Sequence, residues 1–221
     1  MIKKENYELL GKKVIDYVKT MYCPDQYVGQ ITNPDDWKRF YPRTDIFQNQ
    51  TADKLSEIPE GNILLLILES PHTDEFDKKG EPIGPANGTT GTSIRKYICD
   101  IFGNGYQGYH LVLMNAVPYQ CSLGIATKHF RDDVFKIIWE NGCRKFFIDR
   151  LSQIIRKNIV IANCCTKGDD KNMPLYQYVA EAIEETGSKQ DVQLDHPCVR
   201  WQTATNDQKE KVVAAGLYIE K

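Results

Sequence analysis

The 221-residue sequence has no apolar run long enough to cross a membrane. Its longest uninterrupted apolar run covers residues 63–68, which is the length of a strand. The first residues include lysines but no apolar stretch behind them, so we expect no secretory signal and therefore a cytoplasmic protein. These absences also lead us to expect no membrane partner.

Strong net charge and paired cysteine motifs are missing as well. The formal net charge is -2, so binding to nucleic acid would depend on a local basic patch. Seven cysteines are present, but no Cys-x-x-Cys occurs, and only Cys164 and Cys165 are adjacent. An odd number of cysteines without a secretory context favours reduced, buried or incidental thiols over metal ligands. We therefore expect no metal and no cofactor.

The sequence does contain an alternation of strand-like and helix-like segments. Strands are predicted at residues 62–68, 109–115, 158–163 and 191–195. Helices are predicted at residues 93–102 with a cap at Thr92–Ser93, at 131–156 with a break near 141–142, at 174–186 and at 205–215. This order predicts an α/β protein with a parallel sheet and helices on both faces.

The first 60 residues do not follow this alternation. Residues 5–22 predict an amphipathic helix, residues 34–40 a short helix, and the rest of 23–60 irregular structure. We expect a single domain over residues 1–221, in which about 1–60 form an N-terminal helical extension, and a monomer. Residues 71–92 form a long loop rich in glycine and proline, and a loop of that kind is usually functional or disordered.

Three short polar clusters follow apolar runs. They are residues 68–72 (LESPH), 111–117 (LVLMNAV) and 195–197 (DHP). Ligand groups in open α/β sheets gather at the carboxyl ends of the strands, so the three clusters predict one site built from distant segments. The alternative is that ordinary strands end in ordinary turns.

Taken in order, these segments resemble the uracil-DNA glycosylase superfamily. Residues 68–72 are similar to the first motif of the family, with Glu69 and Pro71 matching best, and residues 80–84 and 88–94 are similar to the loop and helix start that follow it. Residues 111–117 look like the strand that carries the base-reading Asn, and residues 195–198 resemble the His-Pro-Ser motif. The resemblance covers roughly residues 60–215. It implies a three-layer α/β/α sandwich around a four-stranded parallel sheet and removal of a base from DNA.

The resemblance implies base-binding roles for two residues. Asn115 would read the base, because a side-chain amide both donates and accepts hydrogen bonds; the alternative is an Asn that merely ends a strand. His196 would donate to the negative charge that develops on the departing base. It would otherwise be an ordinary loop histidine. Asp195 either orients His196 or is solvated.

The first cluster carries the candidates for catalysis. Ser70 stands where the best-known branch of the family has a water-activating Asp, and a serine is a much weaker base. Other branches also lack that Asp, so activity is not excluded. Glu69 either supplies a carboxylate near the sugar or bonds loop amides as a structural group, and His72 is a second candidate base.

The pocket wall and the DNA contacts are also implied by the resemblance. Ile83 stands near the position of a stacking Phe and, with Pro71, would wall the base; Phe76 or Tyr119 are substitutes for it. The candidate DNA contacts are Gly88, Gly91, Thr92, Ser93, Pro197, Arg200 and Trp201. The loop that holds Arg200 and Trp201 would either reach a phosphate or wedge into the duplex. For each basic residue the alternative is a solvated surface. One branch of the family holds an iron–sulfur cluster, but only Cys23 lies in the N-terminal region here, so we expect none.

Two classes of function follow. In the first, the protein flips a damaged or deaminated base out of DNA and hydrolyses its N-glycosidic bond. In the second, it binds a nucleobase, nucleotide or DNA without catalysis, or it processes small nucleotides. Ser70, Ile83 and the slightly acidic charge favour the second class, so whether the protein is an enzyme stays open.

Overall fold

The computed structural model describes residues 22–32, 58–86, 88–121, 131–155, 158–169 and 173–220. The helices expected at residues 5–22 and 34–40 lie outside these ranges. None of the helices within the described ranges is long and apolar enough to cross a bilayer.

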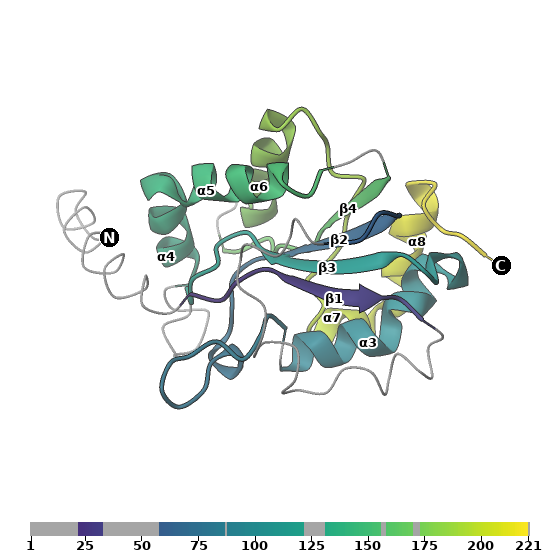
Figure 1. The fold of residues 1–221 in the computed structure, drawn as a ribbon, viewed down its shortest axis with the longest axis horizontal. Helices are drawn as coiled ribbons and strands as arrows, with labels where there is room; N and C mark the ends of the chain where they lie inside the picture. The colour runs from purple at the N-terminus through teal and green to yellow at the C-terminus, as the bar shows by residue number, and fades with distance from the viewer. Residues whose placement is uncertain are drawn as a thin grey trace.

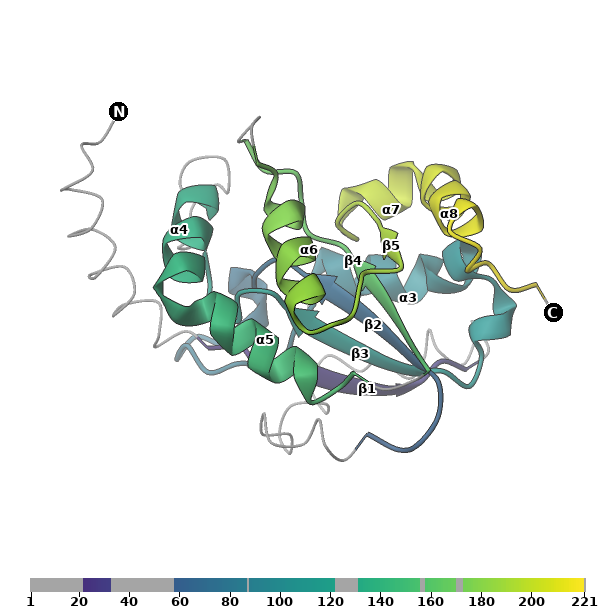
Figure 2. The ribbon, with the colours of Figure 1, turned by 90° about the horizontal axis from the view of Figure 1, so that it is seen from above.

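A five-stranded mixed sheet forms the centre of the molecule. Its strands are β1 (Gln26–Gln30), β2 (Ile63–Leu68), β3 (His110–Asn115), β4 (Ile159–Asn163) and β5 (Val192–Gln193). They lie in the order β1-β3-β2-β4-β5, which can be followed in Figure 2. Strand β2 pairs in parallel with β3 and β4, and β4 pairs in parallel with β5.

Strand β1 corrects the sequence analysis, which expected irregular structure there. It pairs antiparallel with β3 at the edge of the sheet, with an irregularity between Tyr27 and Gly29. Only five residues long and set in a polar, proline-containing region, it has too little apolar pattern to be recognised. Residues 26–30 therefore belong to the sheet and not to a helical extension.

Helices cover both faces of the sheet, as the alternating pattern predicted (Figure 1). One face carries α4 (Arg131–Ile138), α5 (Arg144–Ser152) and α6 (Leu175–Glu185), and the other carries α3 (Thr89–Phe102), α7 (Val199–Thr203) and α8 (Thr205–Ala214). Strand β2 is buried along its whole length. Its odd-numbered residues pack toward α4–α6 and its even-numbered residues toward α3, α7 and α8, which explains the absence of alternation in its sequence.

The helix break predicted near residues 141–142 is confirmed. Helix α4 ends at Ile138, a wider turn covers Trp139–Cys143, and α5 follows directly. Gly142 has φ of 110°, a left-handed conformation that a side chain disfavours. The glycine therefore allows the chain to change direction here while α4 and α5 stay on the same face.

The start of α3 differs from the prediction. The helix begins at Thr89, with Gly88 at its cap position, so Thr92 and Ser93 lie inside the helix and do not cap it. A Cβ at Gly91 would lie 1.8 Å from the carbonyl oxygen of Ala86. Only glycine permits this close approach, which presses the helix start against the preceding loop.

The loop that precedes α3 is folded over the sheet edge. A short 3-10 turn (η2, Thr73–Glu75) follows β2, and Phe76 forms an antiparallel bridge with Pro82. The amide of Ile83 donates to the carbonyl of Glu75 at 2.8 Å. These bonds join residues 75–76 to residues 82–83, so the loop is closed on itself.

Candidate functional site

A pocket of about 270 Å³ lies at the carboxyl ends of the parallel strands. It is lined by Leu68, Glu69, Ser70, Pro71, His72, Asp74, Glu75, Gly88, Thr89, Thr90, Asn115, Arg131, Thr166, His196 and Cys198. All three polar clusters contribute to this lining. The prediction that distant strand ends meet in one place is therefore confirmed, while the roles of the individual residues stay predictions.

Asn115 is the last residue of β3 and pairs with Leu68 of β2, and it is only 1% exposed. Its backbone carbonyl accepts a hydrogen bond of 2.9 Å from Arg150. Arg150 in turn forms a buried ion pair with Asp25, at 2.5 Å and 2.6 Å. Burial raises the pKa of the Asp25 carboxyl and Arg150 partly offsets that rise. The pair anchors the end of β3 from beneath the pocket.

Two buried polar atoms in the pocket lining have no hydrogen-bond partner among the described residues. They are Nδ2 of Asn115 and Oε2 of Glu75. The Asn115 side chain lies close enough to lower the pKa of Glu75, but no hydrogen bond of regular geometry joins the two groups. An unpaired buried polar group costs about 1–3 kcal/mol. A site with two such groups is suited to a ligand that supplies the missing partners.

Glu75 is the main residue that the sequence analysis missed. Its side chain is 5% exposed, and burial raises its pKa to about 8, an increase that the backbone amides of His72 and Ala86 partly offset. The carboxyl is therefore protonated at neutral pH. Within an acidic loop segment, nothing local distinguishes it from a solvated carboxylate, so no sequence signal could have identified it.

Glu69 is fully engaged by neighbouring groups. Its Oε1 pairs with Nε of Arg131 at 2.9 Å, and its Oε2 accepts bonds from the amide of Thr166, at 3.1 Å, and from the Thr166 hydroxyl. Burial raises the pKa of the Glu69 carboxyl, whereas Arg131 and Thr166 lower it. Of the two roles left open for Glu69, this geometry favours the structural carboxylate.

The remaining residues of the first cluster lie along the wall and rim. Ser70 is half-buried; burial raises the pKa of the Cys121 thiol, and Ser70 lies close enough to that thiol to lower its pKa. His72 is exposed, and its Nδ1 accepts from the amide of Asp74 at 3.3 Å. The same Nδ1 lies 3.4 Å from Oδ2 of Asp74, so the polar contacts of His72 are with its own turn.

His196 follows β5, is half-buried and lines the pocket. Asp195 does not orient it. The Asp195 carboxylate accepts a hydrogen bond of 2.9 Å from Gln208 and lies 3.3 Å from Nζ of Lys211. These bonds tie the end of β5 to α8 and leave His196 as the group of this cluster that contributes to the pocket.

Several expected wall and DNA contacts are corrected by the structure. Trp201 is fully buried in the core beneath α3, and its indole donates to the carbonyl of Asp195 at 2.8 Å, so it cannot act as a wedge. The short helix α7, which local pattern did not reveal, turns this aromatic inward. Ile83 is not part of the pocket lining, so it does not wall a bound base there.

The other candidate DNA contacts divide by exposure. Ser93 is buried and donates to the carbonyl of Cys198 at 2.9 Å, and Gly91 and Pro197 are buried too, so none of the three presents a surface to a phosphate. Thr92 and Arg200 are exposed, and Gly88 lines the pocket. Only these last three remain candidates for contact with DNA.

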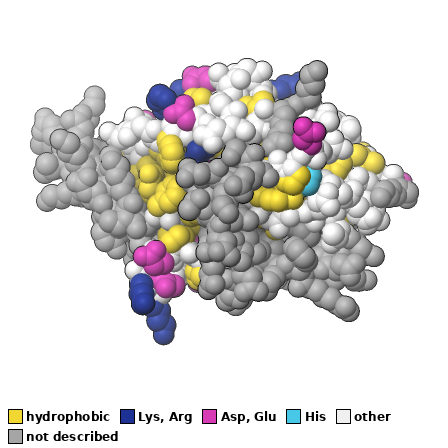
Figure 3. Space-filling view, in the orientation of Figure 1, with side chains coloured by type: hydrophobic (Ala, Val, Ile, Leu, Met, Phe, Trp, Pro, Cys, Tyr) yellow, Lys and Arg dark blue, Asp and Glu magenta, His cyan; other side chains and the backbone are white. Residues whose placement is uncertain are grey.

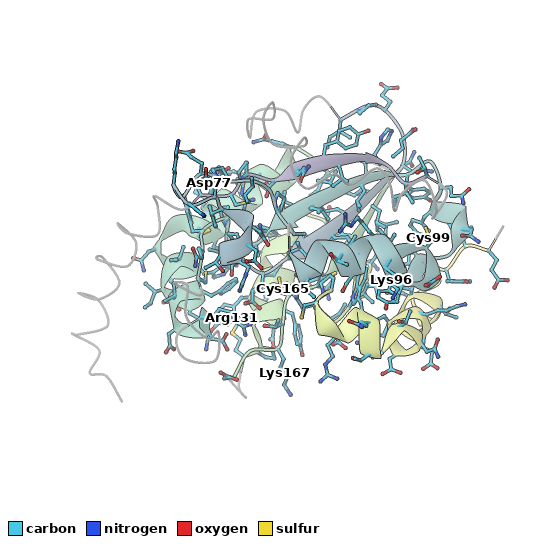
Figure 4. All side chains as sticks on the ribbon, turned by 90° about the horizontal axis from the view of Figure 1, so that it is seen from below. Asp77, Lys96, Cys99, Arg131, Cys165 and Lys167 are labelled. Atoms are coloured by element: carbon cyan, nitrogen blue, oxygen red, sulfur yellow. The ribbon has the colours of Figure 1, made fainter. Side chains whose placement is uncertain are left out.

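Arg131 and Thr166 also line the pocket and were not singled out from the sequence. Thr166 comes soon after β4, so the rule about strand ends could have identified it. Arg131 opens α4 and carries no comparable signal. Figure 4 shows Arg131 and Lys167 on the same side of the molecule, and Lys167 is exposed there.

Charged side chains of both signs lie on one face of the molecule. On the face drawn in Figure 3, lysine and arginine side chains lie beside acidic ones and do not gather in one patch. Within the described part of the chain, no three His, Cys, Asp or Glu side chains are grouped so that they could hold a metal ion.

No protein-family profile, no curated protein and no solved structure matches the chain.

Proposed function

We propose that the protein binds a nucleobase flipped out of DNA in this pocket and hydrolyses its N-glycosidic bond, as a uracil-DNA glycosylase-like protein would. The observation that carries this proposal is the buried Asn115 amide, whose Nδ2 has no partner among the described residues, in a pocket that His196 also lines. A flipped base is read by hydrogen bonds to its pairing edge, and a side-chain amide is suited to that task.

The size of the pocket supports a single base as its occupant. The volume of about 270 Å³ is slightly below the usual range of about 300–1,000 Å³ for ligand sites in proteins. Cleavage of the N-glycosidic bond leaves negative charge on the departing base. Hydrogen-bond donors fixed near that charge stabilise the transition state, and Asn115 and His196 are the proposed donors.

A second function, binding of a nucleobase or nucleotide without hydrolysis, is favoured by the surroundings of Glu69. Both of its oxygens are engaged by Arg131 and Thr166, so Glu69 is poorly placed to activate water. The neighbouring Ser70 is a weak base, and the exposed ring of His72 contacts Asp74 of its own turn. The formal net charge of -2 also fits processing of a small nucleotide.

The two functions are separated by incubating the protein with single- and double-stranded oligonucleotides that carry uracil, hypoxanthine, xanthine or a thymine mismatch. We expect abasic sites with at least one of these bases, and we expect Asn115→Ala and His196→Ala each to lower the rate by roughly 100-fold or more. Asn104→Ala is the matched control, because Asn104 is exposed and lies outside the pocket lining.

Retained binding of a free base without any abasic product would reject hydrolysis in favour of the second function. Excision that survives both pocket substitutions would mean that the reaction takes place elsewhere.

A further inference from the structure

We propose that Glu75 is a ligand-binding residue, whose carboxyl and the Asn115 amide together bind one hydrogen-bond-accepting edge of the molecule in the pocket. The inference rests on the proposed function in taking that molecule to be a nucleobase. An oxo group or an unprotonated ring nitrogen of the base would be the accepting atom.

The geometric basis is the pair of unsatisfied atoms. Asn115 comes from the end of β3 and Glu75 from the turn after β2, and both side chains line the same pocket. Both are more than nine-tenths buried, and each has one polar atom without a partner in the described structure. Buried polar groups in folded proteins are nearly always paired, so two exceptions at one pocket indicate where a ligand binds.

The protonation state of Glu75 decides which kind of edge it binds. Because burial raises its pKa to about 8, the carboxyl carries a proton at neutral pH and can donate. Nδ2 of Asn115 is also a donor. Two donors beside each other match an acceptor on the ligand, whereas an ionised carboxylate would instead require a ligand N–H.

The titratable and charged groups near Glu75 do not reverse this conclusion. Asp74 on the same turn raises the pKa of Glu75 further, and burial first, then Glu75 and Asp25, raise the pKa of the Cys23 thiol, which stays neutral. The pocket lining also holds His72, His196 and the Glu69–Arg131 ion pair.

A purely structural role for Glu75 is the competing explanation, because its carboxyl also accepts bonds from the amides of His72 and Ala86. Glu75→Gln separates the two roles. The glutamine carbonyl can still accept those backbone bonds and its amide can still donate, but the side chain no longer titrates. Glu81→Gln is the matched control, since Glu81 is an exposed glutamate of the same loop.

The experiment measures dissociation constants of free uracil, free hypoxanthine and an oligonucleotide with non-cleavable 2′-fluoro-2′-deoxyuridine between pH 6.5 and 9.5. The ratio of interest is the dissociation constant of the wild type divided by the dissociation constant of Glu75→Gln. This ratio should rise by about tenfold per pH unit above pH 8, because the protonated, donating form of Glu75 is lost there. Titration of the probe cancels in this ratio. At pH 7, Glu75→Ala should weaken binding by roughly 10- to 100-fold.

Four outcomes are decisive. A ratio that rises above pH 8 supports the role of Glu75 even if no base is excised, in which case only the proposed hydrolysis fails. A ratio that does not change with pH overturns the role of Glu75, whatever the excision result. Binding by Glu75→Ala with a dissociation constant within twofold of wild type overturns it as well. A ratio that falls with pH would show that ionised Glu75 accepts from the ligand, which also overturns it. Failure of every probe to bind the wild type overturns both proposals.

Discussion

Glu69 and Glu75 are two buried glutamates on the wall of one pocket, and the described residues provide partners for both carboxylate oxygens of Glu69 but not for both of Glu75. Glu69 is 3% exposed and shares its oxygens with Arg131 and Thr166, so it links the end of β2 to α4 and to the segment after β4. Glu75 is 5% exposed, and one of its oxygens has no hydrogen-bond partner among the described residues. Burial alone therefore does not indicate a binding role. The presence or absence of a charged partner does.

The largest expected effect is the pH dependence of stability that Glu75 imposes. Its folded pKa of about 8 lies well above the ordinary value for an unfolded chain. The stability contributed by the protonated carboxyl is fully present below the unfolded pKa and is lost as pH rises toward 8. Glu75→Gln should therefore be more stable than wild type by up to about 5 kcal/mol at pH 9.

Urea unfolding at pH 5, 7 and 9 measures this difference. We expect the two proteins to be close in stability at pH 5 and to diverge as pH increases. A difference that stays constant across the three pH values would show that Glu75 is ionised in the folded protein over the whole range.

Removal of Arg131, the charged partner of Glu69, should leave Glu69 as a buried carboxyl without an ion pair, as Glu75 is. Arg131→Met leaves a buried carboxylate with only Thr166, and breaking a buried ion pair in this way costs about 3 kcal/mol. The loss should be smaller at pH 5 than at pH 8, because the unpaired Glu69 can take up a proton. Chemical unfolding at both pH values tests this, and a loss that does not depend on pH would argue against a charged Glu69.

Thr166→Val tests the second partner of Glu69. The substitution removes the hydroxyl bond but keeps the backbone amide bond, so the expected loss is about 1–2 kcal/mol. Combining it with Arg131→Met in a double-mutant cycle should show coupling, since both side chains contact the same carboxylate. Strict additivity in denaturation measurements would mean that the two contacts are independent.

Glu81→Gln should have the smallest effect on stability among these substitutions. Glu81 belongs to the same loop as Glu75 but is exposed, so the substitution should change stability by no more than about 0.5 kcal/mol. The change should be equally small at pH 5 and pH 9. A larger or pH-dependent shift in the thermal melting temperature would mean that the Glu81 side chain is buried, in contrast to its exposed position in the structure.

Long local patterns in the sequence were enough to predict most of the sheet and its helices. The six-residue aliphatic run of β2 indicated a strand covered on both faces, and Asn141–Gly142 indicated the break between α4 and α5. Strand β1 was missed because its five residues pair at an edge and carry little apolar signal. Helix α7 was missed because five residues are too few to show a helical period.

The candidate site was predictable as a location but only partly as a set of residues. Polar strand ends led to Asn115 and His196, which do line the pocket. The family resemblance placed Trp201 at the surface, although α7 packs it in the core. Strand ends drew attention to Glu69 and not to Glu75, because a residue at the end of a strand is conspicuous and one in an acidic loop is not.

The sequence by itself determined the α/β class, the buried central strand and the meeting of three polar clusters at one edge of the sheet. These follow from periodicity and strand ends, which depend on residues that are close together in the chain. Only the tertiary structure decided that Glu69 is paired and that Glu75 is not. The partners of Glu69 lie 62 and 97 residues away in the chain, at Arg131 and Thr166. Charge compensation depends on distances in the folded protein, and those distances leave Glu75 as the carboxyl open to a ligand.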